Sequence, residues 1–280
     1  MSKKYPGNII TADAPAGYSM YVDGSSYVTV GSGTTSFTGD FTIEFWANPT
    51  SVGNDQYFFD SAPTLNSFYC EYYLGTLYFN YSASVVASIA MTISANTWYH
   101  IAIVRSGSAT NNVSMYVNGT RVAQGTKTGT MTTSATGWTL GASGSGAYKY
   151  TGYMSNFRVV NGSALYSGAT IPVPTQLMNV GGTNVLTLNS PSFVDQASGY
   201  TVTSSAGTPR MTAFTPFPAY VQYNPALGSS TPGIWTVSDA EYAETSRQWN
   251  MYDPQYNLTT LSLHGNGTNG ARSEEHTSEL

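Results

Sequence analysis

The carboxyl groups of this chain are the first candidates for chemistry, but their spacing does not indicate catalysis. A retaining glycoside hydrolase needs two carboxyl groups about 5–5.5 Å apart. Asp40 and Glu44 share one face of a predicted strand, but Asp40 follows Gly39 at the strand start, where a turn residue is expected anyway. Glu44 therefore stands alone on its strand, and we predict no catalytic residues here.

His100 and Cys70 are the next candidates, and both are expected in packed strands. His100 lies in a run with apolar residues on both faces and no acidic neighbour in sequence, so a satisfied core or interface histidine is favoured over a catalytic base. Cys70 is the only cysteine, which excludes an intrachain disulfide. Neither side chain belongs to a Cys-x-x-Cys or His-x-x-x-His motif, so no zinc site is predicted.

Tyrosines in polar loops are the best candidates for binding. Aromatic rings stack on the apolar faces of sugars, while Asn, Ser and Thr hydrogen-bond to sugar hydroxyls, and the loops here are rich in both kinds of residue. The candidate carbohydrate-binding residues are Tyr148 and Tyr150 in SGSGAYKYTG, Tyr57 in NDQYFF, and the pair Tyr72 and Tyr73. The alternative is structural, because most of the 22 tyrosines must serve as cross-strand partners or half-buried sheet residues.

The elements that would position these side chains are short strands. From Tyr18 to about Val160 the chain alternates between polar and apolar residues in short runs separated by Gly, Asn and Ser clusters. DFTIEFWANP has one apolar face and predicts a strand ending at Pro49, and Asn118-Gly119 predicts a type I′ turn between two strands. Asp23-Gly24 predicts a further turn, of the kind found in a hairpin.

Composition limits the partners of this fold. The chain has 280 residues, of which 41% are hydrophobic, 14% aromatic and only 9% charged, so its surface must consist mainly of Ser, Thr, Asn, Gly and Tyr. The formal charge of −5 favours neither nucleic acid nor an anionic membrane as a partner. We expect no signal peptide and no membrane-spanning segment.

Four motifs in order resemble the laminin-G-like, concanavalin-A-like jelly-roll family. They are YVDGSSYVTV, GDFTIEFWANPTS, NTWYHIAIVRSG with VSMYVNGTRVA, and YTGYMSNFRVVNGSALYSG. The resemblance implies an all-β fold, an antiparallel two-sheet jelly-roll sandwich with about a dozen strands. Glucanases of this fold carry Glu-x-Asp-x-x-Glu or a similar run, which this chain lacks, so a glucanase-like hydrolase is kept only as a minor alternative.

The same resemblance raises calcium as the one cofactor to consider. Many related sandwiches hold Ca²⁺ at a loop rim through Asp or Asn side chains and carbonyl groups. Asp23, Asp60 and Asn118 lie at or near turns and are the candidate ligands. Each also has a structural interpretation, since Asp23 and Asn118 are turn formers and Asp60 can cap a strand end.

The expected domain organisation extends beyond the jelly roll. Residues 180–217 are expected to add strands to it, and Ser238 to Glu241 fits a capping box that would open a short helix to about Trp249. The predicted segments are an N-terminal arm (1–16), the jelly-roll domain (17–217, main match 17–175), a linker with one short helix in an otherwise irregular extension (218–257), and the start of a truncated second module (258–271).

The last nine residues, RSEEHTSEL (272–280), are expected to be foreign to the protein. They hold Arg272, Glu274, Glu275 and Glu279 in an otherwise charge-poor chain. The codons AGA TCG GAA GAG CAC ACG TCT GAA CTC translate to this segment and resemble a widely used sequencing adapter. We therefore predict an adapter artefact, and we leave these residues out of every site.

Three segments also resemble connecting segments of multi-module bacteriophage proteins. They are TNVLTLNSPSFVDQASGYTVTSSAGTPRMTAFTPFP, which begins at Thr183, PGIWTVSDAEY, and YDPQYNLTTLSLHGNGTNG. This resemblance implies a non-catalytic carbohydrate-binding or adhesion module of a phage virion, in a tail fibre or associated with the capsid, that recognises host-surface glycans. The alternative is a purely structural spacer or decoration that contacts other virion proteins. Homo-oligomerisation within a fibre stays open.

Overall fold

The computed structural model describes residues 17–217, except for residues 54, 62–67, 175–176 and 178. Within this range the chain forms strands, turns and loops and no helix. None of these residues belongs to a helix that is long and apolar enough to cross a membrane. The predicted N-terminal arm, the linker with its helix, the second module and the adapter-like ending lie outside the described residues.

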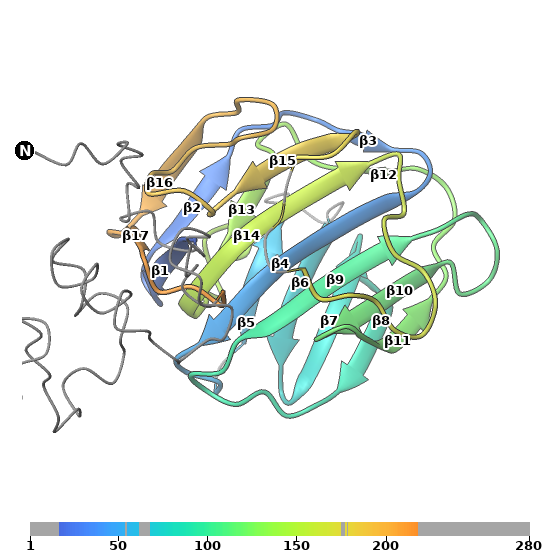
Figure 1. Ribbon diagram of the computed structural model, residues 1–280, viewed down its shortest axis with the longest axis horizontal. Coiled ribbons are helices and arrows are strands. Elements are labelled where there is room, and N and C mark those ends of the chain that lie inside the picture. Colours follow the sequence, from blue (N-terminus) through green and yellow to red (C-terminus); the bar gives the residue numbers. More distant parts are fainter. Residues whose placement is uncertain (1–16, 54, 62–67, 175–176, 178, 218–280) are drawn as a thin grey trace, which may run out of the picture. The chain divides into compact units, whose positions relative to one another are not determined.

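The first layer is an 8-stranded antiparallel sheet (Figure 1). Its strands in spatial order are β11 (Thr120–Gly125), β10 (Val113–Val117), β9 (Tyr99–Arg105), β4 (Phe41–Pro49), β14 (Thr151–Asn161), β1 (Ser19–Asp23) and β17 (Arg210–Thr212), with β15 (Thr183–Thr187) also paired to β14.

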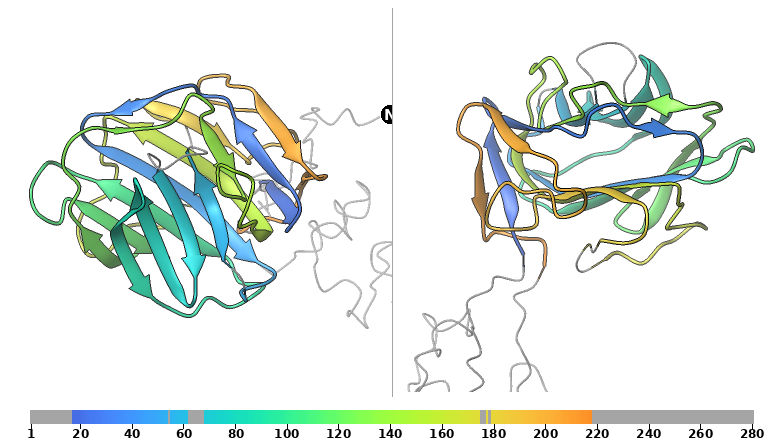
Figure 2. Two further views of the ribbon diagram at one scale, coloured as in Figure 1. Left: turned by 180° about the vertical axis from the view of Figure 1, so that it is seen from behind. Right: turned by 90° about the horizontal axis from the view of Figure 1, so that it is seen from above.

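The second layer is a 7-stranded antiparallel sheet, and the right-hand view of Figure 2 shows the two layers face to face. Its strands in spatial order are β16 (Val202–Ala206), β2 (Tyr27–Val30), β13 (Trp138–Leu140), β5 (Gln56–Asp60), β6 (Phe68–Tyr73), β7 (Thr76–Tyr81) and β8 (Ser84–Ala90). A small two-stranded ribbon pairs β3 (Ser36–Phe37) with β12 (Met131–Thr132). The predicted all-β sandwich is confirmed.

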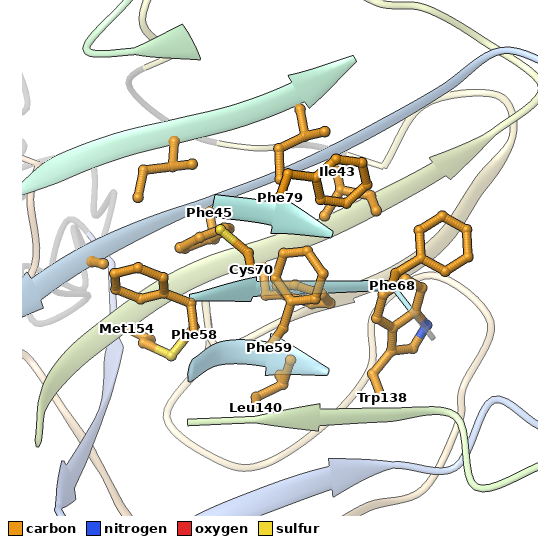
Figure 3. Close-up of a cluster of buried hydrophobic side chains, with 14 of the residues drawn as sticks. Ile43, Phe45, Phe58, Phe59, Phe68, Cys70, Phe79, Trp138, Leu140 and Met154 are labelled. Carbon is orange, nitrogen blue, oxygen red and sulfur yellow. The ribbon is translucent and has the colours of Figure 1, made fainter. Parts of the chain in front are cut away.

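The core between the sheets is built from aromatic rings (Figure 3). Phe45 from β4 packs edge-on against Phe59 from β5 with ring centroids 5.8 Å apart, and Phe59 meets Trp138 from β13 at 5.7 Å. All three side chains are fully buried. This packing joins the two sheets and fixes which face of each strand points inward, so the alternate residues face outward.

The predicted turn at Asn118-Gly119 is confirmed, whereas the hairpin at Asp23-Gly24 is wrong. Asn118 and Gly119 have φ values of 48° and 80° and join the paired strands β10 and β11. At Asp23 the chain also turns, but β1 enters the 8-stranded sheet and β2 the 7-stranded sheet. The reason is that Val22 and Val28 are both buried in the shared core, one from each layer.

Strand β9 is covered on both faces, as its double apolar pattern predicts. Ile101 and Ile103 point into the main core, while Ala102 and Val104 belong to a second cluster that includes Ile171. The segment after β14 runs along the outside of the 8-stranded sheet (Figure 2, right). It is attached by backbone hydrogen bonds, of which the Ile171 amide to the Gly119 carbonyl, 2.7 Å, is one.

Candidate functional site

Three tyrosines form a stacked row on the outer face of the 7-stranded sheet. The Tyr57 ring from β5 lies 5.3 Å from the Tyr69 ring of β6 at 17°, and 5.5 Å from the Tyr148 ring at 20°. These distances and angles are those of parallel stacked rings. We call Tyr57, Tyr69 and Tyr148 the tyrosine row.

Strand alternation places two of these rings on the outside. In β6, Phe68, Cys70 and Tyr72 are buried, whereas Tyr69 and Glu71 face outward. Register brings Glu71 opposite Tyr57 on the neighbouring strand. The row and the glutamate therefore result from the period of two residues in a strand.

Tyr148 reaches the row from the loop between β13 and β14. Its carbonyl accepts a hydrogen bond from the Tyr57 amide, 3.0 Å, which fixes the loop beside β5. The Ser143 side chain bonds to both the amide and the carbonyl of Ala147, and Asp60 Oδ2 accepts from the Gly144 amide at 2.9 Å. Tyr148 itself has a φ of 47°, a conformation that a non-glycine residue adopts only where its surroundings hold it.

The ring at the end of the row is open to solvent. Tyr148 is 55% exposed, whereas Tyr57 and Tyr69 are partly buried. Tyr57 lies between its two neighbours, so its ring faces are largely covered. Tyr148 is thus the member of the row that can present a ring face to a ligand.

A carboxyl pair lies beside the tyrosine row. The Asp55 and Glu71 carboxyl groups lie close enough to interact, and Glu71 also lies close to the Tyr57 hydroxyl. Asn80 Nδ2 donates to Glu71 Oε1 at 3.0 Å. Burial and the negative charge of Asp55 raise the pKa of Glu71 to about 7, and burial also raises the pKa of Asp55. The pair therefore shares a proton near neutral pH.

This arrangement suits binding better than hydrolysis. Asp55 and Glu71 interact directly with each other, whereas the two carboxyl groups of a glycosidase flank the bond that is cleaved. The exposed Tyr148 ring can instead stack on an apolar ligand face. The Tyr57 hydroxyl stays protonated, because burial and the charge of Glu71 raise its pKa.

The other three predicted tyrosines, Tyr150, Tyr72 and Tyr73, are not part of the tyrosine row. Tyr150 is fully buried and its hydroxyl donates to the Tyr153 carbonyl, 3.2 Å. Tyr72 is 6% exposed and donates to the Met91 carbonyl at 3.0 Å. Tyr72 is buried because its position in β6 faces inward, whereas the Tyr150 ring, just before β14, packs against Phe58 in the core. Tyr73 faces outward at the end of β6 and is 42% exposed.

The three predicted calcium ligands do not come together. Asp23 Oδ1 accepts hydrogen bonds from the amides and hydroxyls of Ser25 and Ser26, and these bonds lower its pKa. Asn118 Oδ1 accepts from the His100 amide at 2.8 Å, and Asp60 anchors the Tyr148 loop. Among the described residues, no group of three or more His, Cys, Asp or Glu side chains is arranged to hold a metal ion. Calcium binding stays a prediction.

A charged network that was not predicted lies on the outer side of the 8-stranded sheet. Glu44 receives hydrogen bonds from Arg158 Nε at 2.9 Å and Tyr166 at 2.9 Å, and its other contacts are Arg158 Nη2 and His100 Nε2, the latter at 3.2 Å. Glu44 and His100 are fully buried. Burial alone would raise the pKa of Glu44, but the His100 hydrogen bond and the Arg158 charge together lower it.

The residues of this network are far apart in the sequence and come together only through the register of the paired strands. Glu44 and His100 lie on adjacent strands with Trp46 opposite His100, although the two residues are 56 positions apart. His100 is thus a core histidine with an acidic partner, although its Nδ1 has no hydrogen-bond partner among the described residues. Cys70 is fully buried, as its strand position predicts, and burial raises its pKa.

Comparisons with known proteins agree with this fold. The laminin G model described as the concanavalin A-like lectin/glucanases superfamily matches residues 22–166. No curated protein sequence matches the chain.

Similar solved structures include domains LG4-5 of the mouse laminin alpha1 chain, at 16% identity and a TM-score of 0.41, with 56% of this chain and 47% of that chain covered. The SAP-like pentraxin of Limulus polyphemus is 18% identical with a TM-score of 0.41, and 52% and 76% are covered. The carbohydrate binding module CBM66 from Bacillus subtilis is 16% identical with a TM-score of 0.35, and 52% and 88% are covered. The chain therefore spans about half the length of the laminin fragment.

Proposed function

Because the chain belongs to the concanavalin A-like lectin/glucanases superfamily, we propose that it is a non-catalytic carbohydrate-binding module whose ligand lies against Tyr148. The observation that carries this proposal is the exposed ring of Tyr148 at the end of a fixed row of three tyrosines. A ring that is already held in place loses little conformational entropy when a sugar stacks on it.

The ligand is a neutral glycan. Asp55 and Glu71 flank the row, and a second negative charge brought beside them would be repelled. The partly buried carboxyl oxygens of this pair are instead suited to accepting hydrogen bonds from hydroxyl groups. The charge-poor surface of the whole chain, with 9% charged residues, favours the same class of ligand.

The module is non-catalytic because its acids are placed for binding or for structure. Glu71 interacts with Asp55, and Glu44 is fully buried beneath Arg158, His100 and Tyr166. Neither arrangement combines a solvent-accessible acid with a second carboxyl group at catalytic distance.

The biological setting that fits best is a bacteriophage virion. The proposal rests on the resemblance of the segments from Thr183 onward to connecting segments of multi-module phage proteins. In a tail fibre or on a capsid, the module would attach the particle to host-surface glycans. A spacer that contacts only other virion proteins would need no exposed, prearranged aromatic ring.

A glycan array tests the function directly. The full chain and its Tyr148→Ala variant are applied to an array that includes host envelope glycans, and we expect retention on a neutral glycan that falls at least tenfold in the variant. Tyr73→Ala is the matched control, because Tyr73 is also exposed but is not part of the tyrosine row.

The control variant should bind like the unaltered chain, and all three proteins should have the same melting temperature. Retention on no glycan at all would favour the structural spacer. Release of reducing sugar from a β-glucan would show that the module is an enzyme.

A further inference from the structure

A polar depression lies on the other side of the sandwich from the tyrosine row. It is on the outer face of the 8-stranded sheet over β9, β10 and β11, and has a volume of about 180 Å³. That volume equals about six water molecules at ~30 Å³ each, and is smaller than the ~300 Å³ at which pockets for drug-sized ligands begin. It can hold one monosaccharide unit.

Strand alternation places polar groups beside Val104 in the floor of this depression. Val113, Met115 and Val117 of β10 point into the core, so Ser114 and Tyr116 face outward. Tyr116 is opposite Arg121 on β11, and Ser114 is opposite Gln124. The bulge between Met115 and Tyr116 keeps both β11 side chains on the same outer face.

Two loops form the walls. Ser106, Asn111 and Asn112 border one end, and residues 166–168 border the other, where the Tyr116 hydroxyl donates to the Gly168 carbonyl at 3.0 Å. Asn112 is held in place by both ends of its amide, which bonds to the Gly107 and Lys127 carbonyls and to the Lys127 amide. The walls are therefore fixed before any ligand arrives.

Arg121 is the only charged residue in the lining. Within the described part of the chain its guanidinium has no ion pair, hydrogen bond or ring contact, whereas Arg158 pairs with Glu44, Arg105 donates to Gly129 and Arg210 lies over Tyr21. Arg121 as a whole is partly buried. A planar, unpaired guanidinium is suited to two parallel hydrogen bonds with a carboxylate.

Amide groups beside Arg121 can bind hydroxyls. Gln124 Nε2 donates to the Asn111 carbonyl at 3.2 Å and to Ser114 Oγ at 3.4 Å, which leaves the Gln124 carbonyl oxygen and the Ser114 hydroxyl proton for a ligand. The Asn111 side chain is exposed at the rim. A carboxylate beside several hydroxyls is the chemistry of a hexuronic acid.

We propose that this depression is a second saccharide site that binds the hexuronic acid unit of an acidic glycan, with its carboxylate on Arg121 and its hydroxyls on Gln124, Ser114 and Asn111. The site is separate from the tyrosine row and takes an acidic rather than a neutral ligand. Its lining carries a positive charge, whereas two acids lie beside the tyrosine row. The two sites together let one module contact a mixed neutral and acidic polysaccharide at both outer faces.

Isothermal titration of the full chain with digalacturonate tests this site. We expect binding that weakens at least tenfold in Arg121→Gln and that falls as salt is raised, since salt screens an ion pair at the protein surface. Arg121→Lys keeps the charge but loses the planar pair of hydrogen bonds, and should fall between the two. Arg210→Gln is the matched control and should bind digalacturonate like the unaltered chain.

The variants distinguish binding at this site from binding at the tyrosine row. Tyr148→Ala should leave digalacturonate binding unchanged even if the neutral-glycan proposal fails. Digalacturonate binding that is absent, or that is equal in Arg121→Gln, would overturn the proposal. Acetate that competes with digalacturonate at equal concentration would also overturn it, because the site would then recognise a simple anion.

Discussion

Glu44 and Glu71 lie on different sheets, each beside a tyrosine hydroxyl, and their surroundings are opposite. Glu44 is fully buried and faces Arg158 and His100, so its negative charge is compensated and its pKa is lowered. Glu71 is partly buried and faces a second acid, Asp55, so its charge is opposed and its pKa is raised to about 7. The first arrangement stabilises the ionised carboxylate, whereas the second destabilises it.

The two glutamates differ in what packs over them on the outer face of each sheet. The segment after β14 places Tyr166 over Glu44 and closes that part of the sheet. The Asp55 and Glu71 pair instead lies on an outer face that ends in an exposed ring. The covered and compensated charge of Glu44 indicates a structural role. The uncompensated charge of Glu71, which lies beside an exposed ring, indicates a site where ligand hydroxyl groups can donate hydrogen bonds.

The largest effect is expected from Glu44→Gln. The substitution leaves Arg158 and His100 buried without a carboxylate, and breaking a buried pair in this way costs about 3–5 kcal/mol. Chemical denaturation at pH 7 measures the loss. A loss below about 1 kcal/mol would show that the network contributes little to stability. It would contradict the proposed difference between Glu44 and Glu71.

The effect of pH on the same glutamate has a defined sign. The lowered pKa of Glu44 means that its contribution is present above the unfolded pKa of about 4.5 and is lost as pH falls through the folded value. The difference in the free energy of unfolding between the chain and Glu44→Gln should therefore shrink in acid.

Glu71→Gln should have the opposite and smaller effect. Because the folded pKa of about 7 is higher than the ordinary glutamate value of 4.5, ionised Glu71 destabilises the fold above pH 7, and this loss disappears as pH falls from 7 to 4.5. Glutamine resembles the protonated acid, so the variant should be more stable by about 1 kcal/mol at pH 8, after allowance for solvent screening.

The gain should vanish near pH 4.5, and it should not add to the gain from Asp55→Asn, since the two acids titrate together. Thermal unfolding of the variants from pH 4.5 to 8 gives the comparison. A Glu71→Gln variant that is less stable than the unaltered chain at pH 8 would contradict the like-charge interpretation.

The sequence predicts the fold well because the fold depends on local patterns. Alternation in FTIEFWANP predicts β4 and its end at Pro49, and Asn118-Gly119 predicts the β10–β11 turn. At Asp23-Gly24 the turn is correct, but which sheet the next strand joins depends on packing in the shared core. Alternation along one strand does not contain that information.

The candidate sites depend on register and are therefore less predictable. Tyr57 and Tyr148 are predicted as binding residues, but Tyr69 was missed, because the stacking arises only when β6 is placed beside β5. The Glu44 to His100 contact is hidden for the same reason. Tyr150 differs from Tyr148 by two positions, yet one ring is fully buried and the other is 55% exposed, which composition alone cannot distinguish.

Hydroxyl-radical footprinting of the full chain, with and without a bound neutral glycan, tests most directly whether the tyrosine row is the binding surface. We expect the ligand to protect Tyr148 from oxidation and to leave Tyr73 and the residues around Glu44 unchanged. Tyr148 that is oxidised equally in both states, with protection elsewhere on the sandwich, would contradict the account.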